Sequence, residues 1–242
     1  MAGMCSVQDE GDNPGDAGVI VCSTDPIVLV GGGAIAPGLW DAVAAHAGSV
    51  VAADRGAGAA LARGLVPRVV IGDMDSLRAH DRAALPEGAI HRIAEQETTD
   101  FEKCLRSVRA PLILGLGFGG PRMDHALANF NALVRHPHRR CILLDGKDLA
   151  FLAPPELRID LAVGTRFSVF PMAPVSAVSE GLQWPLKGLA LAPDGRIGTS
   201  NRVSGPVWLR TGAPGLLVIL PVETLGAVVA ALAAGAADPW SG

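Results

Sequence analysis

Acidic residues in three consecutive motifs are the side chains of this sequence best suited to chemistry. The motifs are IGDMDS (71–76), ETTDFEK (97–103) and GGPRMDH (119–125), and apolar runs precede the first and the third. Two carboxylates one residue apart, as in Asp73 and Asp75, can face one hard cation, and Mg²⁺ prefers carboxylate oxygens together with substrate phosphate. The motifs therefore predict a site for a divalent metal and a polyphosphate. Its candidate catalytic residues are Asp73, Asp75, Asp100, Arg122 and Asp124.

The first and third motifs each have a structural explanation as well. In a turn, Asp73 or Asp75 would cap the backbone that follows it. Asp124 fits a helix N-cap, and a surface or packing role is the simpler interpretation of a histidine at 125. Arg122, by contrast, could hold phosphate oxygens bidentately. The glycine-rich loop before it lacks the GK[ST] sequence of a Walker A loop.

The middle motif fits the start of a helix. Thr99 and Glu102 have the spacing of a capping box, which explains both residues without a ligand. Asp100 would then lie in the first turn, beside free N–H groups where anionic ligands also collect. Lys103, on the same turn, could reach a phosphate or remain solvated, and Gln96 could supply a polar contact from the preceding loop.

Apolar runs alternate with helical stretches from Pro26 to about Asp148. The expected strands are IVLV, SVVAA, RVVIG, PLILG and CILLD, and the expected helices include 38–47, 57–64 and 124–135. Strands that are apolar on both faces indicate a parallel sheet covered by helices. We therefore predict an α/β fold with a doubly wound, mostly parallel sheet, whose ligand crevice lies at the carboxyl ends of the strands. Gly31–Gly33 and Asp54 follow two of these strands and fit either that crevice or ordinary tight turns.

The chain changes character after about Asp148. Short β-like segments separated by Pro, Gly and Asp indicate a smaller all-β domain, a sandwich or barrel. The predicted organisation is a flexible leader over 1–25, an α/β catalytic domain over 26–153 and a β-rich domain over 156–242. The apolar stretch from Gly215 to Ala234 is interrupted by Pro, Glu and Gly, which predicts a buried strand and a short helix, not a membrane span.

Composition narrows the class of protein. The 242 residues are 49% hydrophobic with a net charge of −4, which suits a globular protein. No basic stripe or patch indicates nucleic-acid binding. The four cysteines have no metal-site spacing, and the N-terminus lacks the pattern of a signal peptide, so we expect a cytoplasmic protein with no membrane partner.

Taken in order, the motifs resemble the thiamine pyrophosphokinase family. The resemblance runs from about residue 27 to 221 through AADRGA, IGDMDS, EQETTDFEK, GGPRMDHALAN, GLQWPL and GTSN. It implies transfer of pyrophosphate from ATP to the hydroxyl of thiamine, giving thiamine diphosphate and AMP, with Mg²⁺. It also implies a homodimer whose thiamine sites lie between subunits.

The resemblance assigns roles to residues in both predicted domains. Those implied for Mg²⁺ are Asp73, Asp75 and Asp100. Those implied for ATP are Asp54, Gln96, Thr99, Lys103, Arg122 and Asn129. Those implied for thiamine are Trp184, Ser200 and Asn201, and a tryptophan face suits a cationic thiazolium.

Two positions depart from the family pattern, and two other functions remain open. Arg55 stands where the family usually has glycine, so it could add a phosphate contact or narrow the pocket. Pro121 replaces a glycine and removes an N–H donor just before Arg122. The alternatives are a Mg²⁺-dependent phosphotransferase or hydrolase with another acceptor, and a non-catalytic sensor of thiamine or nucleotide.

Overall fold

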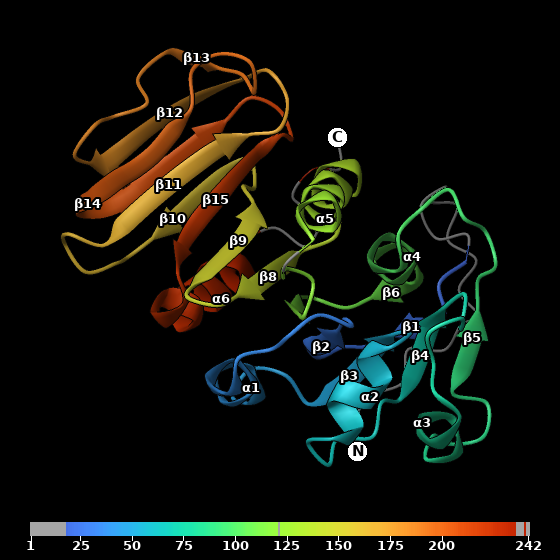
Figure 1. Cartoon of the computed structure of the whole chain (residues 1–242). Helices are drawn as coiled ribbons and strands as arrows, with labels where there is room; N and C mark the ends of the chain where they lie inside the picture. Colours follow the sequence, from blue (N-terminus) through green and yellow to red (C-terminus); the bar gives the residue numbers. More distant parts are fainter. Residues whose placement is uncertain (1–17, 121, 236–239, 241–242) are drawn as a thin grey trace. The chain divides into compact units, whose positions relative to one another are not determined.

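The structure, a computed structural model, describes residues 18–120, 122–235 and 240. The chain divides into two compact units (Figure 1). The first comprises Met1–Ala132 and Leu143–Asp145, and the second comprises Leu133–Ile142 and Gly146–Gly242. The predicted succession of an α/β region and a β-rich region is confirmed at this level.

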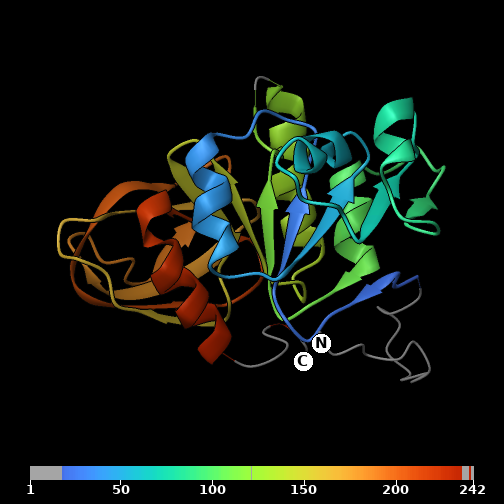
Figure 2. The ribbon, with the colours of Figure 1, turned by 90° about the horizontal axis from the view of Figure 1, so that it is seen from below.

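Helices and strands alternate along the first part of the chain. Its elements are β1 (Val21–Cys22), β2 (Ile27–Val30), α1 (Pro37–Ala44), β3 (Ser49–Ala53), α2 (Gly56–Leu61), β4 (Val69–Gly72), α3 (Ala79–Ala83), β5 (Ile90–Arg92), α4 (Asp100–Ser107), β6 (Val108–Arg109), β7 (Ile113–Leu116) and α5 (Met123–Arg135). The next strand is β8 (Cys141–Asp145). The strands of the first unit lie side by side with helices along them (Figure 2).

The central strands of the first unit pair in parallel in the order β7-β2-β3-β4-β5. Every residue of β2, β4 and β7 is buried. Burial of both faces of a strand removes its whole apolar surface from water, which explains why these strands are short continuous apolar runs. The chain passes from β2 outward to β5 and then returns to the other side of β2 as β7, so the strand order reverses between β2 and β7.

The predicted leader is only partly within the described structure. Residues 1–17 lie outside the described residues. The prediction of a leader that extends to residue 25 is wrong at its end, because Val21–Cys22 form β1 and pair in parallel with Val108–Arg109. Val21 is buried against this part of the fold, so its apolar side chain stabilises a pairing that the sequence pattern did not indicate.

The second unit is an antiparallel β structure. Its strands are β9 (Asp148–Leu152), β10 (Glu156–Ile159), β11 (Arg166–Pro171), β12 (Val175–Leu182), β13 (Leu189–Leu191), β14 (Gly198–Thr211) and β15 (Leu216–Pro221). They run in the order β13-β12-β14-β11-β15-β9, and β10 also pairs with β14. The long strand β14 pairs with β11 through its first part and with β12 and β10 through its second.

The chain of the second unit ends in a short helical region. A 3-10 turn (Val222–Thr224) leads from β15 into α6 (Leu225–Ala234), which confirms the predicted strand and helix in this apolar stretch. Along the described chain, none of the helices has both the length and the apolar character that crossing a membrane requires.

Candidate active site

A cavity of about 590 Å³ in the first unit contains most of the polar residues predicted there. The predicted residues that line it are Asp54, Asp73, Gln96, Thr99, Asp100, Lys103, Arg122 and Asn129. They come from the segments that follow β3 and β4, from the loop before α4 and its first turn, and from the residue before α5 and the middle of that helix. Side chains from distant parts of the sequence therefore meet at one opening, as the positions of the motifs after parallel strands predict.

Two glycine loops form the wall of this cavity at the reversal in strand order. Gly31–Gly33 follows β2, and Gly117–Gly119 follows the neighbouring strand β7. The N–H of Gly33 donates to the carbonyl of Gly117 at 2.9 Å, and a Cβ at Gly33 would lie 2.7 Å from that oxygen. Only glycine permits so close an approach. In parallel sheets such a reversal is where ligand crevices form.

Three carboxylates converge beside the cavity. One ligand oxygen each from Asp54, Asp73 and Asp75 can be chosen so that all lie within 4.8 Å of one another, which makes this group a candidate metal centre within the described residues. The sequence predicted Asp73, Asp75 and Asp100 for this role and gave Asp54 a nucleotide contact. Asp54 joins the group because β3 and β4 are neighbours and end at the same edge.

Asp54 is the most constrained member of this group. It is 3% exposed and adopts a φ of 38°, in the left-handed region that aspartate tolerates better than most residues. Its Oδ2 accepts the N–H of Ser76 at 3.2 Å, whereas Oδ1 is buried with no hydrogen-bond partner among the described residues. The pKa of Asp54 is raised to about 6, chiefly by burial and also by the nearby carboxylates Asp100, Asp75 and Asp73, although the hydrogen bond from the N–H of Ser76 opposes this shift. A cation would satisfy the unpaired oxygen.

Asp73 has the opposite electrostatic environment. Its Oδ2 accepts from Gln96 Nε2 at 2.9 Å, and its Oδ1 accepts the N–H of Asp75 at 3.2 Å. The hydrogen bond from Gln96 is the main reason that the pKa of Asp73 is lowered. The turn-capping interpretation of this aspartate is thus also correct. Gln96 lies next to the carboxylates and orients Asp73.

Asp100 lies next to the same group and is paired with a buried cation. A Cβ placed on Gly72 would be 3.3 Å from Asp100 Oδ1 and 3.0 Å from Asp54 Cβ, so the glycine leaves space for both side chains. Lys103 is 2% exposed, and its Nζ lies 3.2 Å from Asp100 Oδ1. Burial nevertheless raises the pKa of Asp100, although Lys103 opposes this shift.

The loop before α4 is held by a glutamate that the sequence interpretation did not select. Glu95 accepts the N–H groups of Glu97 and Thr98 at 2.8 and 3.0 Å and pairs with Arg106 at 2.8 Å. It also accepts from the hydroxyl of Thr98, which is the main cause that lowers the pKa of Glu95 to about 2. Thr99 caps α4 by accepting the N–H of Glu102, as predicted. The sequence signal for this loop is a glutamate three residues before a threonine, a spacing at which the carboxylate can accept the N–H and the hydroxyl of that threonine.

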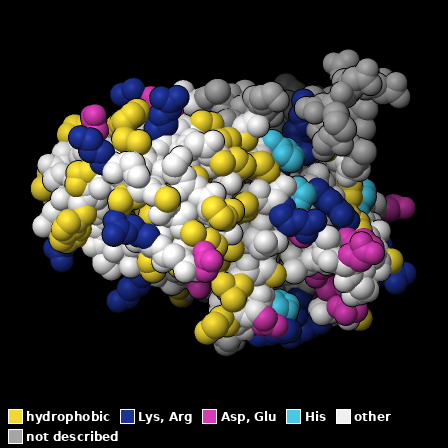
Figure 3. Space-filling view, turned by 90° about the horizontal axis from the view of Figure 1, so that it is seen from above, with side chains coloured by type: hydrophobic (Ala, Val, Ile, Leu, Met, Phe, Trp, Pro, Cys, Tyr) yellow, Lys and Arg dark blue, Asp and Glu magenta, His cyan; other side chains and the backbone are white. Residues whose placement is uncertain are grey.

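The third motif contributes an exposed ion pair, and the helix α5 that it begins contributes a buried amide. Arg122 Nη2 lies 2.6 Å from Asp124 Oδ2, and the hydrogen bond from Arg122 is the main cause that lowers the pKa of Asp124 to about 2. Asn129 is buried and donates to the carbonyl of Phe118 at 2.7 Å, so it holds the second glycine loop. Pro121 lies outside the described residues. In Figure 3, acidic, basic and histidine side chains lie close together on one part of the surface.

The residues predicted for thiamine lie in the second unit and differ in what they contact. Trp184 is 55% exposed. Asn201 is buried, accepts the N–H of Trp184 at 3.1 Å and donates to its carbonyl at 2.6 Å. Ser200 has a φ of 63°, and its N–H donates to Ser168 Oγ at 3.0 Å. Asn201 therefore holds the backbone that presents the tryptophan.

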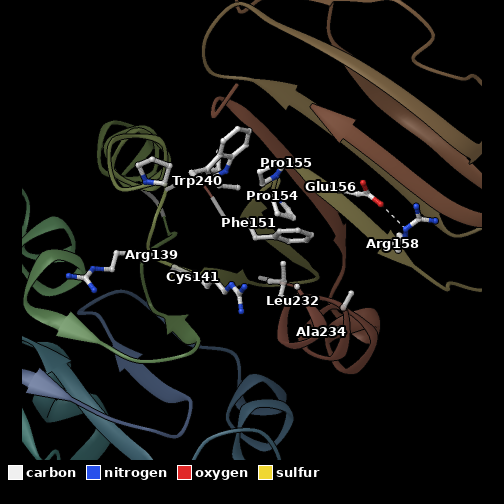
Figure 4. Close-up of a pocket in the computed structure, with 15 residues that line it drawn as sticks. Arg139, Cys141, Phe151, Pro154, Pro155, Glu156, Arg158, Leu232, Ala234 and Trp240 are labelled. Atoms are coloured by element: carbon white, nitrogen blue, oxygen red, sulfur yellow. Dashed lines mark hydrogen bonds and ion pairs between the residues drawn. The ribbon is translucent and has the colours of Figure 1, made fainter. Parts of the chain in front are cut away.

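A separate cavity of about 380 Å³ lies within the second unit (Figure 4). Its apolar lining includes Phe151, Leu152, Pro154, Pro155, Leu232 and Trp240. Beside it, Arg158 Nε donates to Glu156 Oε1 at 2.7 Å, and Trp240 Nε1 donates to the carbonyl of Ala153 at 3.3 Å. The described residues that line it include none of the predicted site residues, so we do not assign this cavity to the candidate active site.

Two family models match the chain in the order of its two units. Residues 40–144 match the catalytic domain of thiamin pyrophosphokinase, and residues 156–216 match its vitamin B1 binding domain. Thiamine pyrophosphokinase 2 of Arabidopsis thaliana is 30% identical over 182 residues, which cover 66% of this chain and 67% of that protein. The chain belongs to the thiamin pyrophosphokinase family.

Other relatives within this family agree. Thiamine pyrophosphokinase 1 of Arabidopsis thaliana is 33% identical over 156 residues, which cover 57% of this chain and 58% of that protein. The chain thus spans less than two thirds of that relative. Thiamin pyrophosphokinase from Candida albicans has the same fold, with a TM-score of 0.70 at 17% identity over 82% of this chain and 89% of that one. The yeast enzyme gives 0.68 at 17% identity over 86% and 93%.

Proposed function

We propose that this chain transfers the pyrophosphoryl group of ATP to the hydroxyl of thiamine, giving thiamine diphosphate and AMP. The observation that carries the proposal is the group of Asp54, Asp73 and Asp75 beside a cavity walled by two glycine loops. Membership of the thiamin pyrophosphokinase family supports the choice of donor and acceptor. A sensor would not need this concentration of carboxylates, because binding alone requires no stabilisation of a leaving group.

The residues of the candidate metal centre fit Mg²⁺. Carboxylate oxygens are its preferred protein ligands, and the buried, unpaired Oδ1 of Asp54 is an orphan that a cation would satisfy. We assign Asp54, Asp73 and Asp75 as the residues that would hold it, with Asp100 alongside. Bound there, Mg²⁺ would neutralise negative charge on the phosphate oxygens.

The remaining residues position the reactants and move one proton. The thiamine oxygen forms a bond to the β-phosphorus, and the bond from that phosphorus to the oxygen bridging to the α-phosphorus breaks, so AMP leaves with that oxygen. We assign Asp100 as the acceptor of the hydroxyl proton. Its raised pKa makes it a better base than Asp73, whose pKa is lowered. Lys103, at 3.2 Å from Asp100, limits the accumulation of negative charge.

Nucleotide contacts are assigned to the side chains around the same cavity. Gln96, Thr99, Lys103, Arg122 and Asn129 line it and remain our proposed ATP-binding residues, with Arg122 and Asp124 acting as a pair. In the second unit, Trp184 is the proposed thiamine contact. Ser200 and Asn201 shape its loop.

Several broader properties belong to the same proposal. The parallel pairing and the reversal between β2 and β7 support a doubly wound first domain over 26–153. The antiparallel pairing supports a sandwich- or barrel-like second domain over 156–242. We also propose a homodimer and a cytoplasmic location, which the family resemblance and the sequence support.

The direct test is incubation with ATP, Mg²⁺ and thiamine, followed by separate quantification of thiamine diphosphate, AMP and ADP. Equal amounts of thiamine diphosphate and AMP are expected. Formation of ADP and thiamine monophosphate would instead show that the protein transfers a single phosphoryl group. If AMP forms only when another acceptor replaces thiamine, thiamine is not the substrate. Omission of Mg²⁺ should abolish product formation.

A further inference from the structure

Arg55 is a cation at the edge of the candidate active site that the proposed function leaves without a role. It follows Asp54 directly and lines the cavity of about 590 Å³. Its Nη2 donates to the carbonyl of Gly32 at 3.2 Å, and its Nε would lie 3.2 Å from a Cβ at Gly32. The guanidinium is therefore held over the first glycine loop.

The other arginine and the lysine of this cavity are already paired with carboxylates. Lys103 pairs with Asp100, and Arg122 pairs with Asp124. The hydrogen bond of Arg55 to a carbonyl leaves its positive charge without a carboxylate partner among the described residues. Guanidinium groups present several N–H donors in a planar fork that matches phosphate oxygens.

The space around Arg55 is large enough for a phosphate group. Arg55 and Gly32 also line a neighbouring cavity of about 630 Å³, which Arg78 lines as well. Arg55 directly follows Asp54, a member of the carboxylate group, and both residues line the cavity of about 590 Å³. A polyphosphate held at this carboxylate group would therefore have a phosphate group within the cavity that Arg55 lines.

We propose that Arg55 binds the terminal phosphate of the nucleotide and makes this site selective for nucleoside triphosphates. The proposal rests on the proposed function only in placing the nucleotide in this cavity. Loss of one charge-assisted contact to phosphate should weaken binding by about 10- to 100-fold.

The test is calorimetric titration of ATP, ADP and AMP, each with Mg²⁺, into the wild-type protein and three variants. Arg55→Gly should weaken ATP binding by about 10-fold or more and change AMP binding by less than about 2-fold. Arg55→Lys should recover part of the ATP affinity because it restores the charge without the fork. Arg78→Ala is the matched control, since Arg78 is exposed and lines the neighbouring cavity but not the cavity of about 590 Å³, and it should bind ATP as the wild type does.

Three results would overturn the proposal. They are unchanged ATP affinity in Arg55→Gly, an equal loss for ATP and AMP, and an equal loss in Arg78→Ala. The second would show that Arg55 only shapes the Gly32 loop. Thermal unfolding of each variant without nucleotide tests for a general loss of structure, and glycine is well tolerated where Arg55 precedes α2.

The result separates this proposal from the proposed function. If ATP binding depends on Arg55 but no thiamine diphosphate forms, the proposed reaction fails and the role of Arg55 stands. If thiamine diphosphate forms and the ATP affinity does not depend on Arg55, the proposed reaction stands and the role of Arg55 fails.

Discussion

The two units of this protein use polar side chains in contrasting ways. Around the cavity of the first unit, the carboxylate of Asp54 is buried with one oxygen unpaired, and burial raises its pKa to about 6. In the second unit, the side-chain amide of Asn201 is also buried, but its oxygen and its nitrogen both form hydrogen bonds with the backbone of Trp184. Asp54 therefore has an oxygen that can still bind a ligand, whereas the hydrogen bonds of Asn201 hold the loop that contains Trp184.

This difference indicates that the first unit carries the reactive groups and that the second holds an exposed side chain for recognition. Unpaired buried charge destabilises the folded protein and is retained where a ligand compensates for it. Satisfied buried amides stabilise a backbone conformation and leave recognition to an exposed side chain, here Trp184. Substitutions in the first unit should therefore affect turnover most, and those in the second should affect stability and thiamine affinity.

The largest effect is expected from Asp54→Asn. Asparagine tolerates the positive φ of Asp54, so the fold should persist while the charge at the metal centre is lost. We expect kcat to fall by about 1000-fold or more. Steady-state kinetics with thiamine and ATP, combined with circular dichroism, measures both properties. Asp41→Asn, at an exposed carboxylate of the same unit, should leave kcat unchanged. Near-normal turnover in Asp54→Asn would remove this residue from the metal centre.

Trp184→Ala should produce the next largest effect. The side chain is 55% exposed, so its loss should change the free energy of unfolding by less than about 0.5 kcal/mol. Loss of a cation–π contact of about 2 kcal/mol would raise the KM for thiamine by about 30-fold, whereas the KM for ATP should not change. Val163→Ala removes another exposed apolar side chain of the second unit and serves as the control. Equal KM values in the Trp184 variant and the wild type would contradict the assignment.

Asn201→Ala should lower the stability of the protein more than Trp184→Ala does and weaken thiamine binding less. The Trp184 N–H and carbonyl lose their partner, so the free energy of unfolding should fall by about 2 kcal/mol. The KM for thiamine should rise by a smaller factor than in Trp184→Ala, because the indole remains. Denaturant titration and thiamine kinetics test this pair of expectations. A variant as stable as the wild type would show that the amide does not hold the loop.

The smallest effect concerns the pH dependence of stability. The pKa of Glu95 is lowered from 4.5 in the unfolded chain to about 2 in the folded protein. Its stabilising contribution is therefore complete above about pH 4.5 and is lost as the pH falls toward 2. Since the side chain is partly exposed, we expect this contribution to be roughly 1 kcal/mol. Glu95→Gln should lose that part of the pH dependence in denaturant titrations between pH 5 and pH 2, whereas Glu97→Gln should retain it.

The sequence predicts the parallel strands well and some antiparallel strands poorly, for a physical reason. Strands buried on both faces, such as Ile27–Val30, are continuous apolar runs. Val175–Leu182 alternates buried with exposed residues, and its Ser and Glu positions make it resemble a polar linker. Val21–Cys22 is too short to give any pattern, so its pairing with β6 depends on tertiary contacts.

The candidate site divides in the same way. Residues at the ends of apolar strands, such as Asp73, are predictable because parallel strands end at one edge of a sheet. That Asp54 joins Asp73 and Asp75 depends on which strands are neighbours, and that Asn201 bonds to Trp184 depends on a turn. Neither follows from local sequence, because both are contacts between segments that only the fold brings together.

Transfer of the pyrophosphoryl group as one unit is most directly measured in a single turnover with ATP labelled at the β-phosphate. With excess protein, Mg²⁺ and thiamine, we expect the label to pass entirely into thiamine diphosphate and the AMP to be unlabelled. Label in ADP, or label retained in ATP while thiamine is unchanged, would contradict the account.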